Sequence, residues 1–114
     1  MKVLIVDESM TRRAAIRRCL EVVPGEFEPL DARDEAEADR MLHREPQAVV
    51  CRESWLEIGA HLLDRAKRRS PAPRVVATTS DIGTLSGPAA PGITFVLDPF
   101  TPMELVQSVR TATS

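Results

Sequence analysis

The chain has 114 residues, a length typical of one domain, and we expect a single domain over residues 1–114. Apolar residues make up 43% and charged residues 28% of the sequence, which excludes the composition of a disordered or membrane chain. The net charge of −2 provides no overall basic field, so we expect this domain to bind neither nucleic acid nor membrane lipid.

The amino terminus and the two cysteines indicate the compartment. The apolar run at residues 2–6 is short, and Asp7 and Glu8 follow it at once. Signal peptides and membrane-spanning helices need longer apolar segments, so we expect a cytoplasmic protein. Cys19 and Cys51 lie within apolar patterns and lack the short spacing of zinc ligands, which predicts buried, reduced thiols.

Strand-like and helix-like patterns alternate along the chain. A continuous run of β-branched residues and leucine predicts a strand covered on both faces, whereas apolar residues three and four apart predict a helix. Pro29 places the second strand at an edge of the sheet, because proline cannot donate a ladder hydrogen bond. In chain order we predict a strand at 2–6, a helix from the cap Ser9 to Val23, a strand at 27–30, a helix at 34–44, a strand at 48–51, a helix that includes 62–69, strands at 75–79 and 93–97, and a helix from about Thr101.

This alternation with short connections predicts an α/β fold, a doubly wound parallel sheet with helices on both faces. One stretch differs from the rest. Glycine or proline occupies five of the ten positions from Gly83 to Gly92, so the fourth helix should be short, irregular or missing. This stretch is either a static docking surface or a segment that only a partner orders.

Ligands of open α/β sheets bind beyond the carboxyl ends of the strands. The residues at these ends are Asp7 with Glu8, Arg52, Thr78 and Asp98. Their surroundings are KVLIVDES with Arg12, PQAVVCR, VVATTS and FVLDPFTPMEL, which together span essentially the whole chain. In this order the motifs resemble those of the receiver domains of bacterial response regulators. The resemblance implies a CheY-like, flavodoxin-like sheet of five parallel strands in the order 2-1-3-4-5.

The resemblance also implies roles for four residues of the pocket and its surroundings. Asp7 and Glu8 match the acidic pair that binds magnesium in the family. Thr78 matches the hydroxyl residue that contacts the phosphoryl group, and Phe95 matches the aromatic switch residue. These positions therefore keep the residue types of the family.

Three other positions depart from the family. Arg52 stands where the family has its phosphorylated aspartate, and arginine cannot form an acyl phosphate. Asp98 stands where the family has a lysine that pairs with that aspartate. Thr79 replaces a smaller alanine or glycine and should crowd a phosphoryl group. The sequence is thus similar to a degenerate receiver, or pseudo-receiver.

The two charge reversals suggest that Arg52 and Asp98 pair directly, with the family's carboxylate and ammonium exchanged. In one alternative Arg52 spans Asp7 or Glu8 and fills the space of a magnesium ion. In another, Arg52 and Asp98 are separately hydrated. Because Mg²⁺ prefers near-octahedral oxygen ligands and one carboxylate is replaced by a cation, we expect no cofactor. Asp7 and Glu8 are the candidates for any residual metal site.

Three further features have two interpretations each. Glu53 is the alternative phosphoacceptor, although alternation along the strand predicts that it points away from Arg52. Arginines at positions 12, 13, 17 and 18 form either a solvated helix face or a docking face beside the pocket. Trp55, predicted in the loop after Arg52, is either a core residue or an exposed interface anchor.

The sequence therefore predicts a receiver-like module of two-component signal transduction that is not an enzyme. Without phosphorylation at the usual site, it would act by binding a protein: a histidine kinase, a phosphotransfer protein or an output domain. One alternative is a phosphoacceptor that uses a displaced carboxylate such as Glu53. Another is a small nucleotide-binding enzyme, which is disfavoured because no glycine-rich phosphate loop follows the first strand.

Overall fold

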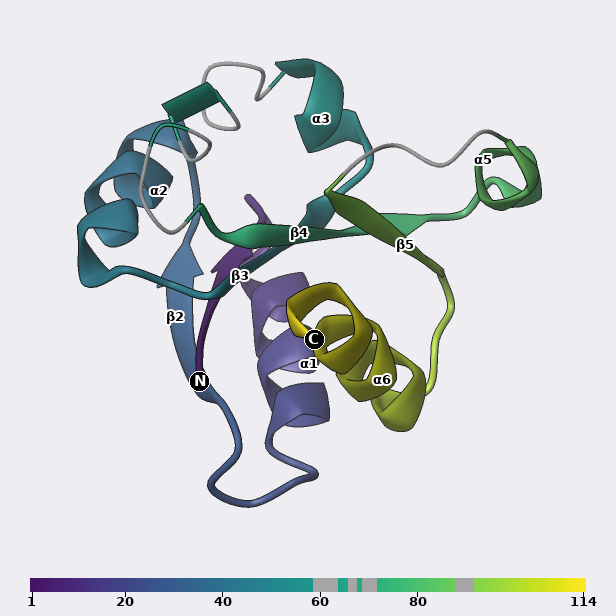
Figure 1. The fold of residues 1–114 in the computed structure, drawn as a ribbon, viewed down its shortest axis with the longest axis horizontal. Helices are drawn as coiled ribbons and strands as arrows, with labels where there is room; N and C mark the ends of the chain where they lie inside the picture. Colours follow the sequence, from purple (N-terminus) through teal and green to yellow (C-terminus); the bar gives the residue numbers. More distant parts are fainter. Residues whose placement is uncertain (59–63, 66–67, 69–71, 88–91) are drawn as a thin grey trace.

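Five strands form one parallel sheet in the computed structural model, which describes residues 1–58, 64–65, 68, 72–87 and 92–114 (Figure 1). The strand order is β2-β1-β3-β4-β5, which confirms the predicted fold class and order. β2 lies at one edge, as Pro29 predicted, and β5 lies at the other. The strands are β1 (Lys2–Val6), β2 (Glu28–Ala32), β3 (Ala48–Arg52), β4 (Arg74–Thr79) and β5 (Ile93–Leu97).

Helices cover both faces of this sheet (Figure 1). α1 (Met10–Leu20) and α6 (Pro102–Thr113) lie side by side on one face, while α2 (Glu35–Met41) and α3 (Ser54–Ile58) lie on the other. A 3₁₀ turn, η1 (Leu42–Arg44), follows α2, and α5 (Ile82–Ser86) lies beyond β5. Because successive strand side chains alternate between faces, Val3 and Ile5 join the core under α1 and α6, and Leu4 and Val6 join the opposite core.

Two caps fix where the helices beside the pocket begin. The Ser9 hydroxyl accepts a hydrogen bond of 3.2 Å from the backbone N–H of Arg12, which confirms the predicted cap of α1. Thr101 and Glu104 form a capping box at the start of α6. Both helices therefore begin within a few residues of a strand end. Arg12, the third residue of α1, lies near the carboxyl ends of the strands.

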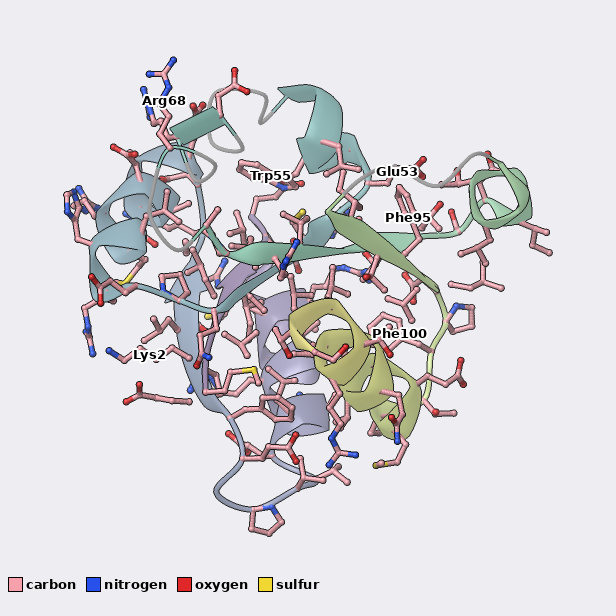
Figure 2. All side chains as sticks on the ribbon, in the orientation of Figure 1. Lys2, Glu53, Trp55, Arg68, Phe95 and Phe100 are labelled. Carbon is pink, nitrogen blue, oxygen red and sulfur yellow. The ribbon has the colours of Figure 1, made fainter. Side chains whose placement is uncertain are left out.

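The structure differs from the sequence prediction around α3 and agrees with it at α5. Most of the helix predicted to include residues 62–69 lies outside the described residues. Trp55 was wrongly predicted in a loop: α3 begins directly after β3, and the indole packs between α3 and the sheet (Figure 2). α5 has only five residues, which confirms a short fourth helix.

Among the described residues, no helix is long and apolar enough to cross a membrane.

The thiol of Cys51 should make stability depend on alkaline pH. Burial raises the pKa of this thiol from 9.0 to about 12, and the nearby Asp7 carboxylate adds to the shift. Since the unfolded chain loses the proton first, stability from the buried neutral thiol is present below pH 9 and is lost as the pH rises toward 12. The free energy of unfolding should fall by up to about 1.4 kcal/mol per pH unit in this window.

Denaturant unfolding of wild type and Cys51→Ala between pH 8 and pH 11 measures this effect. The alanine variant should be less stable at pH 8 and should show a shallower decline with pH. Parallel declines of the two proteins would contradict a buried neutral thiol.

Candidate functional site

A buried carboxylate at the end of β1 is the centre of the strand-end pocket. The side chain of Asp7 is 1% exposed. Its Oδ1 accepts hydrogen bonds from the backbone N–H of Ser9 at 2.9 Å and from Nη2 of Arg52 at 3.2 Å. Its Oδ2 accepts from Nε of Arg52 at 2.8 Å. The guanidinium of Arg52, at the end of β3, therefore holds Asp7 with two parallel hydrogen bonds.

A second guanidinium enters the pocket from the first turns of α1. Arg12 donates from Nη2 to the Thr78 hydroxyl at 2.7 Å and from Nη1 to Oδ2 of Asp98 at 3.0 Å. Its Nε lies 3.1 Å from Oδ2 of Asp7, an ion pair without hydrogen-bond geometry. One side chain therefore joins the ends of β1, β4 and β5.

These contacts correct the expected direct pair of Arg52 and Asp98. No ion pair joins these two described residues; Arg52 binds Asp7, and Arg12 binds Asp98. The alternative in which Arg52 spans Asp7 is the arrangement that occurs. The physical reason is that Arg12 reaches Oδ2 of Asp98 from the first turn of α1, while Arg52 neutralises the buried carboxylate of Asp7. Glu8 is exposed and contributes to none of the described ion pairs.

Glu53 occupies the same pocket, contrary to the expectation that it points away. β3 ends at Arg52, so strand alternation no longer applies to the following turn residue. Its carboxylate accepts hydrogen bonds from the Thr79 hydroxyl at 2.6 Å and from the Thr84 hydroxyl at 2.9 Å. The extra hydroxyl of Thr79 thus binds Glu53, which ties the turn after β3 to the end of β4 and to α5.

The side chains at the strand ends enclose an open, polar hollow of about 390 Å³. Charged side chains and hydroxyls line it, and none of the described residues that line it is a cysteine or a histidine. Its charged groups already have partners within the chain: Arg12 binds Asp98, Arg52 binds the buried Asp7, and Glu53 accepts from two threonine hydroxyls. The lining residues are Arg12, Arg52, Glu53, Ser54, Thr78, Thr79, Ser80 and Asp98.

The other arginines of α1 are also bound within the chain. Arg13 donates to the backbone carbonyl of Asp7 at 2.6 Å, and Arg17 pairs with Asp31 at 2.8 Å. Arg18 is exposed and donates to the carbonyl of Ala14. The prediction of a simple solvated face was therefore wrong for Arg12. Because most of these groups have partners, they do not form an unpaired basic docking face.

Phe95 lies outside the pocket, in a second hollow at the β5 edge. This hollow, of about 500 Å³, lies between α5, β5 and α6, and Leu85 and Met103 also line it. Figure 2 shows Phe95 and Glu53 toward the α5 end of the sheet. Leu85 is 42% exposed and Met103 is 41% exposed. The second hollow is therefore an apolar surface. The hydrogen bond from Thr84 of α5 to Glu53 links the α5 side of this surface to the pocket.

Fold and strand order are those of the receiver domains of two-component response regulators, which are signalling domains. No protein-family model matches the sequence, and no curated protein does. The chemotaxis response regulator CheY4 of Vibrio cholerae is 19% identical with a TM-score of 0.73, over 97% of each chain. A response regulator from Thermotoga maritima is 24% identical with a TM-score of 0.74, over 98% of this chain and 96% of that one. The response regulator domain of Thermotoga maritima CheB is 20% identical with a TM-score of 0.71, over 99% and 96%.

Removal of the Asp7 carboxylate should destabilise the fold far more than removal of its neighbour. Asp7→Ala leaves Arg52 without its described ion-pair partner and Arg12 with Asp98 alone, and should cost about 3 kcal/mol, the low end for breaking a buried pair, since Arg52 is partly exposed. Glu8→Ala should change stability by no more than about 0.5 kcal/mol. Urea unfolding measures both variants, and equal losses would contradict the assignment of Asp7 as the centre of the pocket.

Proposed function

We propose that this chain is a cytoplasmic receiver-like module of two-component signalling that is not phosphorylated at the usual site and acts by binding another protein. The observation that carries the proposal is the bidentate bond from Arg52 to Asp7. Arg52 ends β3, where the resemblance places the phosphoacceptor, and its guanidinium cannot accept a phosphoryl group. The chain therefore keeps the scaffold of a receiver without its acceptor.

The pocket also does not fit the magnesium ion that receiver chemistry needs. Both oxygens of Asp7 already accept hydrogen bonds, and Arg52 and Arg12 place positive charge beside them. The described residues contain no group of three histidine, cysteine or acidic side chains able to hold a metal. A divalent cation would have to displace two guanidiniums that are covalently part of the chain. We therefore propose that the module needs no metal cofactor.

Glu53 is poorly suited to be a displaced phosphoacceptor. Its two carboxylate oxygens accept hydrogen bonds from Thr79 and Thr84, and a nucleophilic attack would first have to break one of them. The hydrogen bonds of Glu53 favour a structural role.

The surface between α5, β5 and α6 is the candidate docking site for the partner. It combines the apolar hollow around Phe95 with the exposed side chains of Ile82, Leu85 and Met103. Residues 75–109 contain three acidic residues and no lysine, arginine or histidine. We propose that a histidine kinase, phosphotransfer protein or output domain presents apolar and basic side chains to this surface.

Phosphodonor treatment tests the central claim. Acetyl phosphate with Mg²⁺ should leave the intact mass of the wild-type protein unchanged, because Arg52 stands at the acceptor position and both carboxylate oxygens of Asp7 and of Glu53 already accept hydrogen bonds. A receiver that has its aspartate, treated in parallel, should gain a phosphoryl adduct. An adduct on this chain that disappears in Glu53→Gln would instead establish the displaced acceptor.

Site-specific photo-crosslinking in cells tests the docking surface. A photoreactive amino acid at Leu85 or Met103 should give a discrete adduct with a signalling protein, because these side chains are exposed at the apolar hollow. The matched control is Val22, which is 51% exposed, follows α1 and does not line the hollow. The same adduct from all three positions, or an adduct from Val22 alone, would place the partner elsewhere.

A further inference from the structure

Oxygen atoms from three strand ends converge on a single guanidinium. Nε, Nη1 and Nη2 of Arg12 lie 3.1 Å from Asp7, 3.0 Å from Asp98 and 2.7 Å from Thr78, respectively. Asp7 and Asp98 directly follow β1 and β5, and Thr78 lies near the end of β4, so the three oxygens come from segments that are far apart in sequence. A cation is therefore what holds two carboxylates and a hydroxyl together at this edge.

Charge balance shows why the pocket needs this cation. Asp7 and Asp98 contribute two negative charges, and Arg12 and Arg52 contribute two positive ones, so these four ion-paired groups are neutral together, while Glu53 is bound by hydroxyls. Without Arg12 the buried Asp7 would keep Arg52, whereas Asp98 would lose its only described ion-pair partner. A group that brings carboxylates together in this way is, in many proteins, a divalent metal ion with oxygen ligands.

We propose that Arg12 is this chain's own substitute for a divalent cation, and that it blocks a latent cation site at the strand ends. Arg52 blocks the same site from β3. The inference deepens the proposed function, since it explains how the pocket stays closed at any metal concentration. It does not depend on phosphoryl chemistry, because the claim concerns cation binding alone.

The two arginines differ in what each one blocks. Arg52 occupies only Asp7, so its replacement by aspartate adds a carboxylate but leaves Arg12 between Asp7 and Asp98. Replacement of both arginines leaves three carboxylates and the Thr78 hydroxyl with no internal cation. A site for Mg²⁺ or Mn²⁺ should therefore open only when both guanidiniums are removed.

Titration of four folded proteins with Mn²⁺ tests this proposal. Wild type and Arg52→Asp should bind Mn²⁺ weakly, whereas Arg12→Ala/Arg52→Asp should bind at least tenfold more tightly. The matched control is Arg13→Ala/Arg52→Asp, which removes an arginine of the same helix that contacts only the Asp7 carbonyl, and it should behave as Arg52→Asp does. Calorimetry gives the affinity, and the fluorescence of Trp55, the only tryptophan, gives an independent readout.

Two results would overturn the proposal. One is Mn²⁺ binding by Arg52→Asp as tight as that of the double variant, which would mean that Arg12 blocks nothing. The other is a folded double variant that binds no more tightly than wild type. If Arg12→Ala/Arg52→Asp does not fold, Arg12→Met/Arg52→Asp keeps the apolar length of the side chain and allows the same comparison. No phosphodonor is present, so either result leaves the test of phosphorylation separate.

Discussion

The pocket depends on one buried charge, the Asp7 carboxylate, and on the two guanidiniums that neutralise it. An ionised carboxylate that is 1% exposed is costly unless its charge and its lone pairs are matched. Here the Ser9 amide and Arg52 supply the hydrogen bonds, and Arg12 adds a second positive charge. Arg12 also donates to Thr78 and Asp98, so one guanidinium links the buried charge at the end of β1 to the ends of β4 and β5.

In the proposed function, guanidiniums of the chain take the place that an exchangeable ligand would occupy. A metal ion or a phosphoryl group joins and leaves a pocket according to its concentration, and a protein can use that exchange as a signal. Guanidiniums that belong to the chain do not exchange. Under the proposed function, binding and release of such a ligand therefore do not serve as the signal in this pocket.

Much of the fold followed from sequence patterns, but the contacts of the pocket did not. Strand periodicity, Pro29 at the edge and Ser9 at the cap depend on neighbouring residues, so the sequence carried that information. Pairing among charged side chains depends on which of several long, flexible groups lies close enough to an oxygen in the folded chain. Arg12 belongs to a run of arginines that suits a solvated face equally well, so only its position one turn into α1 could have indicated the pocket. The prediction of a loop at Trp55 was wrong because only Glu53 separates the end of β3 from the start of α3.

The hydrogen bond of Glu53 with Thr84 holds α5, which forms one side of the apolar hollow at the β5 edge. A helix of five residues is not stable by itself, so the orientation of α5 has to come from outside the helix. The Thr84 hydroxyl supplies it by donating to Glu53, and Asp81 caps the first turn. The backbone of α5 that carries Leu85 is therefore anchored to the turn after β3. For the proposed docking, this anchoring lowers the backbone entropy that binding at α5 would cost.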